Sequence, residues 1–146
     1  MGMMDATDLY LGTWRLVPEL SLYEAGSPPA SGTYVIAAAG AEARLEVHWR
    51  MAVGEPEQST AFGGPVDGTP VALPVGAAGS AGPDAFTLTR LDARTLDSAA
   101  LRGGEVVAFA RRVAAADGSL LAVVQEGPKP GGGRFRNFQV YRREGG

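Results

Sequence analysis

Glycine and proline break this chain into short segments, and this punctuation constrains its fold more than any other feature. The 146 residues include 21 glycines and 10 prolines, and few of the windows between them carry the spacing of an amphipathic helix. Residues 44–51 alternate strictly between polar and apolar side chains. Their apolar face consists of Leu45, Val47, Trp49 and Met51. Alternation with a period of two predicts a strand with one buried face, so the sequence predicts an all-β protein.

Ten strands follow from this punctuation. The dipeptide Asp117-Gly118 is a favoured hairpin turn, and Gly103-Gly104 marks another. The alanine-rich stretches 37–43 and 108–116 have helical propensity, but propensity is a weak guide and glycine interrupts or ends both at hairpin spacing. The predicted strands are 12–20, 32–37, 44–52, 57–62, 69–73, 85–90, 95–101, 105–113, 120–126 and 135–143.

The lengths of the connections favour a barrel over a sandwich. In an up-and-down meander, the long or glycine-rich connections 21–31, 74–84 and 127–133 all lie at one end, and the short ones lie at the other. One open end and one tightly turned end are typical of a barrel that holds a ligand. We therefore predict a single antiparallel up-and-down β-barrel of roughly eight to ten strands. It spans residues 1–146, with 1–9 as a flexible N-terminal tail.

The composition excludes several kinds of site. The chain has no cysteine and one histidine, which excludes disulfides, thiol nucleophiles, thiolate metal sites and sites with two or more histidines. No serine is tied by spacing to His48, and no helix is predicted after the glycine run 131–133. The sequence thus predicts neither a nucleophile–base pair nor a loop that cradles phosphate. We expect no metal and no cofactor.

Charge and hydropathy bear on partners and location. Residues 134–143 interleave arginines with aromatic residues, as single-strand nucleic-acid binders do. The whole chain, however, has a net charge of −3, whereas nucleic-acid-binding domains are typically basic, so we expect no nucleic-acid partner. The N-terminus has no basic region before an apolar run, and no apolar stretch approaches the ~18 residues that span a membrane. A cytoplasmic protein without membrane insertion is expected.

Two motifs and their spacing resemble a known family. Gly12-Thr13-Trp14, near the N-terminus, is similar to the Gly-x-Trp signature of the lipocalins and the fatty-acid-binding proteins. Residues 138–143 resemble the closing strand of the latter, and the ten-strand spacing resembles this calycin group, most closely its lipocalin-like bacterial members of unassigned function. The resemblance implies a barrel that holds a small hydrophobic ligand, such as a fatty acid. The connection 21–31 is too short for the two-helix lid of fatty-acid-binding proteins, so we expect a mouth without a lid.

The resemblance also implies which residues hold the ligand. In fatty-acid-binding proteins an Arg-x-Tyr pair on the last strand, helped by an arginine two strands earlier, grips a carboxylate. Gln139 and Tyr141 stand where that pair would lie, and Arg111 stands near the position of the earlier arginine. Because a glutamine replaces one arginine, a single fixed cation remains. Arg111 shares a face with Val107 and other apolar residues, so it either finds a partner in the ligand or in Glu126, or reaches solvent at the end of the barrel.

The last strand can take two registers. With Gln139 and Tyr141 inward, Asn137 joins them in a polar inner stripe that water or a ligand must satisfy, which favours a cavity. The opposite register places Phe138 and Val140 in the core. The remaining candidates for the cavity wall are Trp49 and Met51, which suit adaptable apolar ligands.

The residues Gly12, Trp14 and Arg142 are predicted to close the base of the barrel. Strand parity puts the start of the first strand beside the end of the last, so Trp14 lies near Arg142 and Arg143. An arginine stacked on the indole would seal this end.

Three functions remain open at this stage. The first is binding or carriage of a small hydrophobic ligand, with its polar end oriented by Arg111, Gln139 and Tyr141. The second is a barrel enzyme or haem-dependent protein that uses His48, since histidine serves both as a general base and as an axial ligand; the alternative is that His48 lies on the surface. The third is a packed barrel that acts as a protein-interaction module, for instance as a homodimer through the basic last strand.

Overall fold

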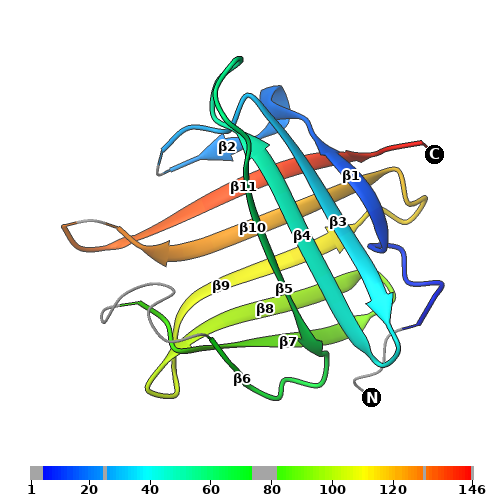
Figure 1. Ribbon diagram of the computed structural model, residues 1–146, viewed down its shortest axis with the longest axis vertical. Helices are drawn as coiled ribbons and strands as arrows, with labels where there is room; N and C mark the ends of the chain where they lie inside the picture. The colour runs from blue at the N-terminus through cyan, green and yellow to red at the C-terminus, as the bar shows by residue number, and fades with distance from the viewer. Residues whose placement is uncertain (1–4, 25, 74–81, 130, 146) are drawn as a thin grey trace.

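The chain folds into one antiparallel sheet that curls into a nearly closed barrel (Figure 1). The computed structural model describes residues 5–24, 26–73, 82–129 and 131–145. Its first strands are β1 (Gly12–Leu16), β2 (Leu22–Tyr23), β3 (Ser31–Ala39), β4 (Glu42–Arg50), β5 (Gln58–Pro65) and β6 (Val71–Ala72). The others are β7 (Ala85–Asp92), β8 (Thr95–Arg102), β9 (Glu105–Ala114), β10 (Leu120–Pro128) and β11 (Arg134–Arg143). A short 3-10 helix, η1 (Pro18–Leu20), follows β1.

The strand order confirms the predicted all-β, up-and-down barrel. Hydrogen-bonded neighbours run β5-β4-β3-β1-β11-β10-β9-β8-β7-β6, so the last strand returns to the first. Backbone hydrogen bonds from Gly68 N to Leu88 O and from Arg90 N to Val66 O, both 2.9 Å, join the chain after β5 to β7. In Figure 1, β3, β4 and β5 cross in front of β7, β8 and β9 at a steep angle. The core lies between these two layers and includes Trp14, Tyr34, Ile36, Leu45, Leu88, Leu96 and Leu121.

The first strand is shorter than predicted. The predicted strand 12–20 ends at Leu16 because Pro18 has no N–H to donate to a neighbouring strand and instead begins η1. The chain then forms β2, which the sequence pattern does not predict and which pairs with β11 through Tyr23↔Asn137 and Leu22↔Phe138. The part of the β1–β3 connection that forms β2 is therefore paired with the rim of the barrel rather than an open loop.

An arginine stacked on Trp14 seals the closed end, as predicted, but it is Arg143. The Arg143 Cζ lies 4.2 Å from the centroid of the fully buried indole. Its guanidinium donates to the carbonyls of Leu11 at 2.8 Å and Gly118 at 2.6 Å, among others. The prediction for Arg142 was wrong: side chains alternate along β11, and Arg142 is exposed on the outer face opposite Arg15.

Gly12 completes this seal, and we expect Gly12→Ala to destabilise the protein by about 3 kcal/mol. Its φ of +133° is unfavourable for any residue with a Cβ, and that Cβ would collide with Arg143 Nη1. Gly40→Ala is the matched control, since Gly40 has a φ of +65° but no heavy atom within 4 Å of the place that a Cβ would occupy. The control should cost only ~1 kcal/mol, the penalty of a left-handed residue. Urea unfolding measures both; equal losses would show that the Arg143 contact does not matter.

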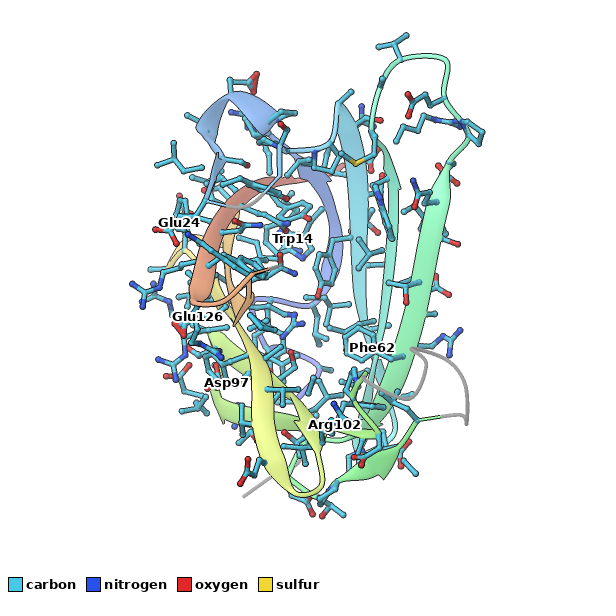
Figure 2. The ribbon with its side chains drawn as sticks, turned by 90° about the vertical axis from the view of Figure 1, so that its left-hand side faces the viewer. Trp14, Glu24, Phe62, Asp97, Arg102 and Glu126 are labelled. Carbon is cyan, nitrogen blue, oxygen red and sulfur yellow. The ribbon has the colours of Figure 1, made fainter. Side chains whose placement is uncertain are left out.

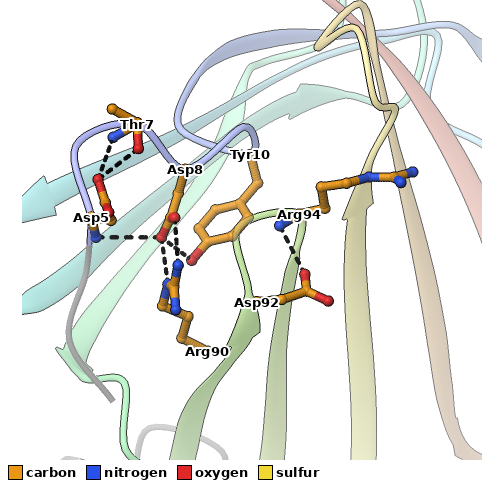
Figure 3. A network of polar contacts seen from close by, with 7 residues as sticks. All are labelled: Asp5, Thr7, Asp8, Tyr10, Arg90, Asp92 and Arg94. Carbon is orange, nitrogen blue, oxygen red and sulfur yellow. Dashed lines mark hydrogen bonds and ion pairs between the residues drawn. The ribbon is translucent and has the colours of Figure 1, made fainter. Parts of the chain in front are cut away.

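The N-terminal segment packs across the closed end, where a flexible tail was expected for 1–9 (Figure 3). The Asp8 carboxylate accepts hydrogen bonds from Arg90 Nε at 2.7 Å, from Arg90 Nη2 at 2.8 Å and from the Tyr10 hydroxyl at 2.7 Å. Leu9 N donates to Ala93 O at 2.7 Å. Residues 1–4 lie outside the described part of the chain. For 5–9 the expectation fails because Asp8 is buried and pairs with an arginine on β7.

No helix in the described part of the chain is long and apolar enough to span a bilayer.

Candidate ligand-binding site

A cavity of about 460 Å³ lies inside the barrel, toward the end opposite Trp14. Figure 2 looks into this side of the molecule, with Trp14 deep inside and Phe62 on the wall that β5 provides. The apolar part of the lining is Leu16, Pro29, Val47, Trp49, Met51, Phe62 and Ala110. The polar part is Tyr23, Ser27, Tyr34, Thr60, Ser98, Arg112, Gln125, Gln139 and Tyr141. An interior with this many polar groups is amphipathic, unlike a packed apolar core.

Among the described residues that line this cavity, the only charged group is the guanidinium of Arg112 on β9. Arg112 is 3% exposed. Its Nε donates to the Tyr34 hydroxyl at 2.6 Å and its Nη1 to the Leu96 carbonyl at 3.5 Å. Both acceptors are neutral, and no carboxylate of a described residue lies within ion-pair distance. A buried cation without an anion is costly, so the site presents a positive charge that an anionic group would satisfy.

A second polar group is built around Gln139 of β11. The Tyr141 hydroxyl donates to Gln139 Oε1 at 2.8 Å, and Gln139 Nε2 donates to the Tyr23 hydroxyl at 2.5 Å and to Gln125 Oε1 at 3.3 Å. The rings of Tyr34 and Tyr141 meet edge to face, 5.5 Å apart, which joins this group to Arg112. Gln139 and Arg112 also share a row of the sheet, because both pair with Val123 of β10.

The tyrosine hydroxyls of this group stay neutral at ordinary pH. Burial raises the pKa of Tyr141 well above its usual value, and the neighbouring Tyr34 and Tyr23 raise it further, against the opposing effect of the Arg112 guanidinium. Burial also raises the pKa of Tyr23, against the opposing effect of the hydrogen bond from Gln139. The electrostatic character of the cavity is therefore one positive charge surrounded by neutral donors and acceptors.

Arg111 does not lie in this cavity, contrary to the expectation from the sequence. It points to the outer face of β9, where Nε and Nη2 donate to the two oxygens of Asp97 at 2.8 Å each. Its guanidinium also lies 5.7 Å from the centroid of the Phe109 ring on the same face. Asp97 pairs with Arg111 across the strands, so this arginine already has its anion. The cation that enters the barrel is its neighbour, Arg112.

The other residues predicted to bind the ligand fall into two groups. Gln139 and Tyr141 point inward and line the cavity, and so do Trp49 and Met51, with Met51 at the rim and 41% exposed. The inward register of the last strand is thus the observed one. Asn137 is buried outside the lining of the cavity; its Oδ1 accepts from Glu24 N at 2.9 Å and so helps to fix the segment that carries Tyr23.

His48 lies outside the barrel. It is on the face of β4 opposite Trp49, half-exposed, with its Nδ1 3.6 Å from Glu57 Oε2. An axial ligand or general base acting inside the barrel would have to project from the other face. Among the described residues no group of three or more histidine, aspartate or glutamate side chains could hold a metal ion.

Several lining residues are absent from the set predicted by sequence. Tyr34 sits on β3, where its alternation with Ile36 is a usable signal for an inward face. Tyr23 lies in the connection that was expected to be an open loop, where no periodic pattern marks it. Arg112 lies on a strand that the sequence predicts, but the large apolar residues of β9 indicate the opposite face as the interior.

No protein-family model and no curated protein matches this chain. The barrel and its cavity are therefore the basis for inferring what the protein does.

Proposed function

We propose that the barrel binds a small amphipathic molecule with an anionic head, and that Arg112 holds the head. The observation that carries this proposal is the burial of Arg112 in a cavity of about 460 Å³. Among the described residues that line this cavity, none has a carboxylate. A carboxylate bound there would gain charge-assisted hydrogen bonds and remove the penalty of an isolated buried charge. Gln139 and the tyrosine hydroxyls would orient its second oxygen.

The rest of the lining suits the apolar part of such a ligand. Trp49, Phe62 and Met51 lie on β4, on β5 and at the rim, away from the strand that carries Arg112. Burial of apolar surface contributes about 25 cal/mol per Å² before the cost of ordering the ligand, so this wall would supply much of the affinity. The molecule class is therefore a hydrophobic acid rather than a sugar or a nucleotide.

The likeness to lipocalins and fatty-acid-binding proteins supports the same proposal. The chain combines Gly12 and Trp14 at the closed end with a meandering strand order in which the last strand returns to the first. A calycin-like barrel carrying a hydrophobic ligand accounts for both. The alternatives are less well supported, because His48 faces outward and a packed interaction module would leave no room for a cavity of this size.

Trp49 offers a direct test of binding. We expect addition of dodecanoate to change the tryptophan emission of the wild-type protein, because Trp49 lines the cavity whereas Trp14, the other tryptophan, is sealed under Arg143. Trp49→Phe should lose this change while calorimetry still detects binding. An emission change that persists in Trp49→Phe would place the ligand elsewhere. Native mass spectrometry of the purified protein, with extraction of any retained molecule, would identify a natural ligand.

A further inference from the structure

A second, smaller cavity of about 210 Å³ opens beside the first. The two cavities adjoin each other, since Ser98, Ala110 and Gln125 line both of them. The remaining lining of the smaller cavity is Ala100, Ala108, Phe109, Glu126 and Phe135. Alanine methyl groups and aromatic rings thus line most of it.

This space exists because two hairpins separate at the open end. The β9–β10 pairing runs from Ala114↔Leu121 to Phe109↔Glu126 and stops there. Beyond that point β9 remains paired with β8, through Ala108↔Ala100, and β10 remains paired with β11, through Gly127↔Phe135. In Figure 1 the β8–β9 and β10–β11 hairpins point away from each other on the left.

Small residues keep the space between the hairpins open. A Cβ on Gly127 would lie 2.9 Å from Phe135 Cε1. The ring of Phe135 therefore lies directly over residue 127 and can do so because this residue has no side chain. On the opposite side, Ala100 and Ala108 face each other across β8 and β9 and reach only one carbon into the gap. The one ionisable side chain in this described lining, Glu126, has a partner in Arg136 at 3.3 Å.

We infer that this space is a groove for the alkyl tail of the ligand, which leaves the barrel between the two hairpins. The inference rests on the proposed function, because the head of the ligand is taken to bind Arg112. Ala108 lies four residues from Arg112 on the same strand and on the same face, about 13 Å away at ~3.3 Å per residue. The ligand class is therefore an unbranched, medium-length or longer monocarboxylate, whose tail passes Ala110 and Ser98 and ends between Ala100 and Phe135.

The test compares a long and a short acid in a protein whose groove is filled. Dodecanoate reaches the groove from Arg112, whereas hexanoate stays in the main cavity. Ala108→Leu should weaken the affinity for dodecanoate about tenfold, the loss expected when roughly two methylene groups are no longer buried. The affinity for hexanoate should change less than about twofold, and this also shows that the variant is folded. Ala61→Leu, an exposed outer position on β5, is the matched control and should leave both affinities unchanged.

The outcomes separate the inference from the function on which it rests. If Ala108→Leu binds dodecanoate as tightly as the wild type does, or weakens both acids equally, the tail does not use the groove, and the inference is overturned while the proposed function stands. If the wild-type protein binds neither acid in calorimetry, the proposed function fails and the groove assignment fails with it. A selective loss for dodecanoate supports both.

Discussion

Replacing Arg112 with methionine is expected to weaken the binding of dodecanoate about 100-fold, because truncating a buried, hydrogen-bonded charge leaves the anion without its partner at a cost of ~3 kcal/mol. Methionine keeps the length and most of the volume of the side chain, so the shape of the cavity should persist. The neutral analogue dodecanol should lose far less affinity in the variant. Calorimetric titration of both ligands into both proteins measures the difference.

The same substitution is expected to stabilise the unliganded protein by about 1 kcal/mol. In the unliganded protein Arg112 is 3% exposed, and among the described residues its guanidinium donates to two neutral oxygens, those of the Tyr34 hydroxyl and the Leu96 carbonyl. Replacing a buried charge that has no anion by an apolar side chain removes a desolvation penalty. A binding residue that lowers the stability of the empty protein is typical of a site built for a ligand. Urea unfolding without ligand gives the sign.

Arg111→Met is the matched control, since it removes the adjacent arginine on the outer face. It should leave the affinity for dodecanoate unchanged and lower the stability, because Asp97 loses its two hydrogen bonds from Arg111. If Arg112→Met binds dodecanoate as tightly as the wild type does, the head group is not held at Arg112. If Arg111→Met is the variant that fails to bind, the arginine predicted from the sequence is the right one and the structural assignment is wrong.

Sequence reasoning placed Arg111 in the cavity, whereas the structure places Arg112 there. This difference shows which parts of the fold and of the site could be predicted from the sequence. Most of the strands, β2 excepted, were predictable because glycine turns and period-two alternation mark them locally. The inner face of β9 was not predictable, because a β-bulge shifts the pairing of β8 with β9 by one residue between Ala100 and Leu101. Counting from the Gly103-Gly104 turn without this shift puts Arg111 opposite Leu96 and inside the barrel. A bulge leaves no reliable local signal, and a one-residue slip reverses both faces.

The apolar pattern of β9, like the count from the turn, indicates the face that carries Arg111 as the interior. Val107, Phe109 and Val113 form the face that hydrophobicity predicts to be buried, whereas the inner face is made of alanines around Arg112. Small residues line the interior where a cavity must remain open, so the usual rule that large apolar residues face inward fails at the site itself. The closed end was easier to predict, because Trp14 and the arginines at the end of the chain are brought together by barrel closure alone.

Replacing Asp8 should lower the stability of the protein about as much as Gly12→Ala does. The sequence does not indicate the role of Asp8, because its partner Arg90 is 82 residues away. The carboxylate is fully buried, and Arg90 and Tyr10 donate three hydrogen bonds to it (Figure 3). Removing one partner of such a pair leaves a charge uncompensated, so we expect Asp8→Ala to lower the free energy of unfolding by about 3 kcal/mol. Glu144→Ala is the control: its 2.5 Å pair with Arg15 is exposed and should contribute less than ~1 kcal/mol.

A comparison of the wild-type protein with Asp8→Asn across pH shows whether the charge of Asp8 or its packing stabilises the fold. Burial of Asp8 opposes its ionisation, but the hydrogen bonds from Arg90 and Tyr10 outweigh burial and hold its pKa below the usual value. A carboxyl group whose pKa is lowered on folding stabilises the protein above its unfolded pKa of ~3.9, and this contribution disappears as the pH falls through the folded pKa. The wild-type protein should therefore be more stable than Asp8→Asn at pH 7, and the gap should narrow progressively below about pH 4. Urea unfolding across this range measures the gap, and a gap that does not change with pH would mean that Asp8 closes the barrel by its shape and not by its charge.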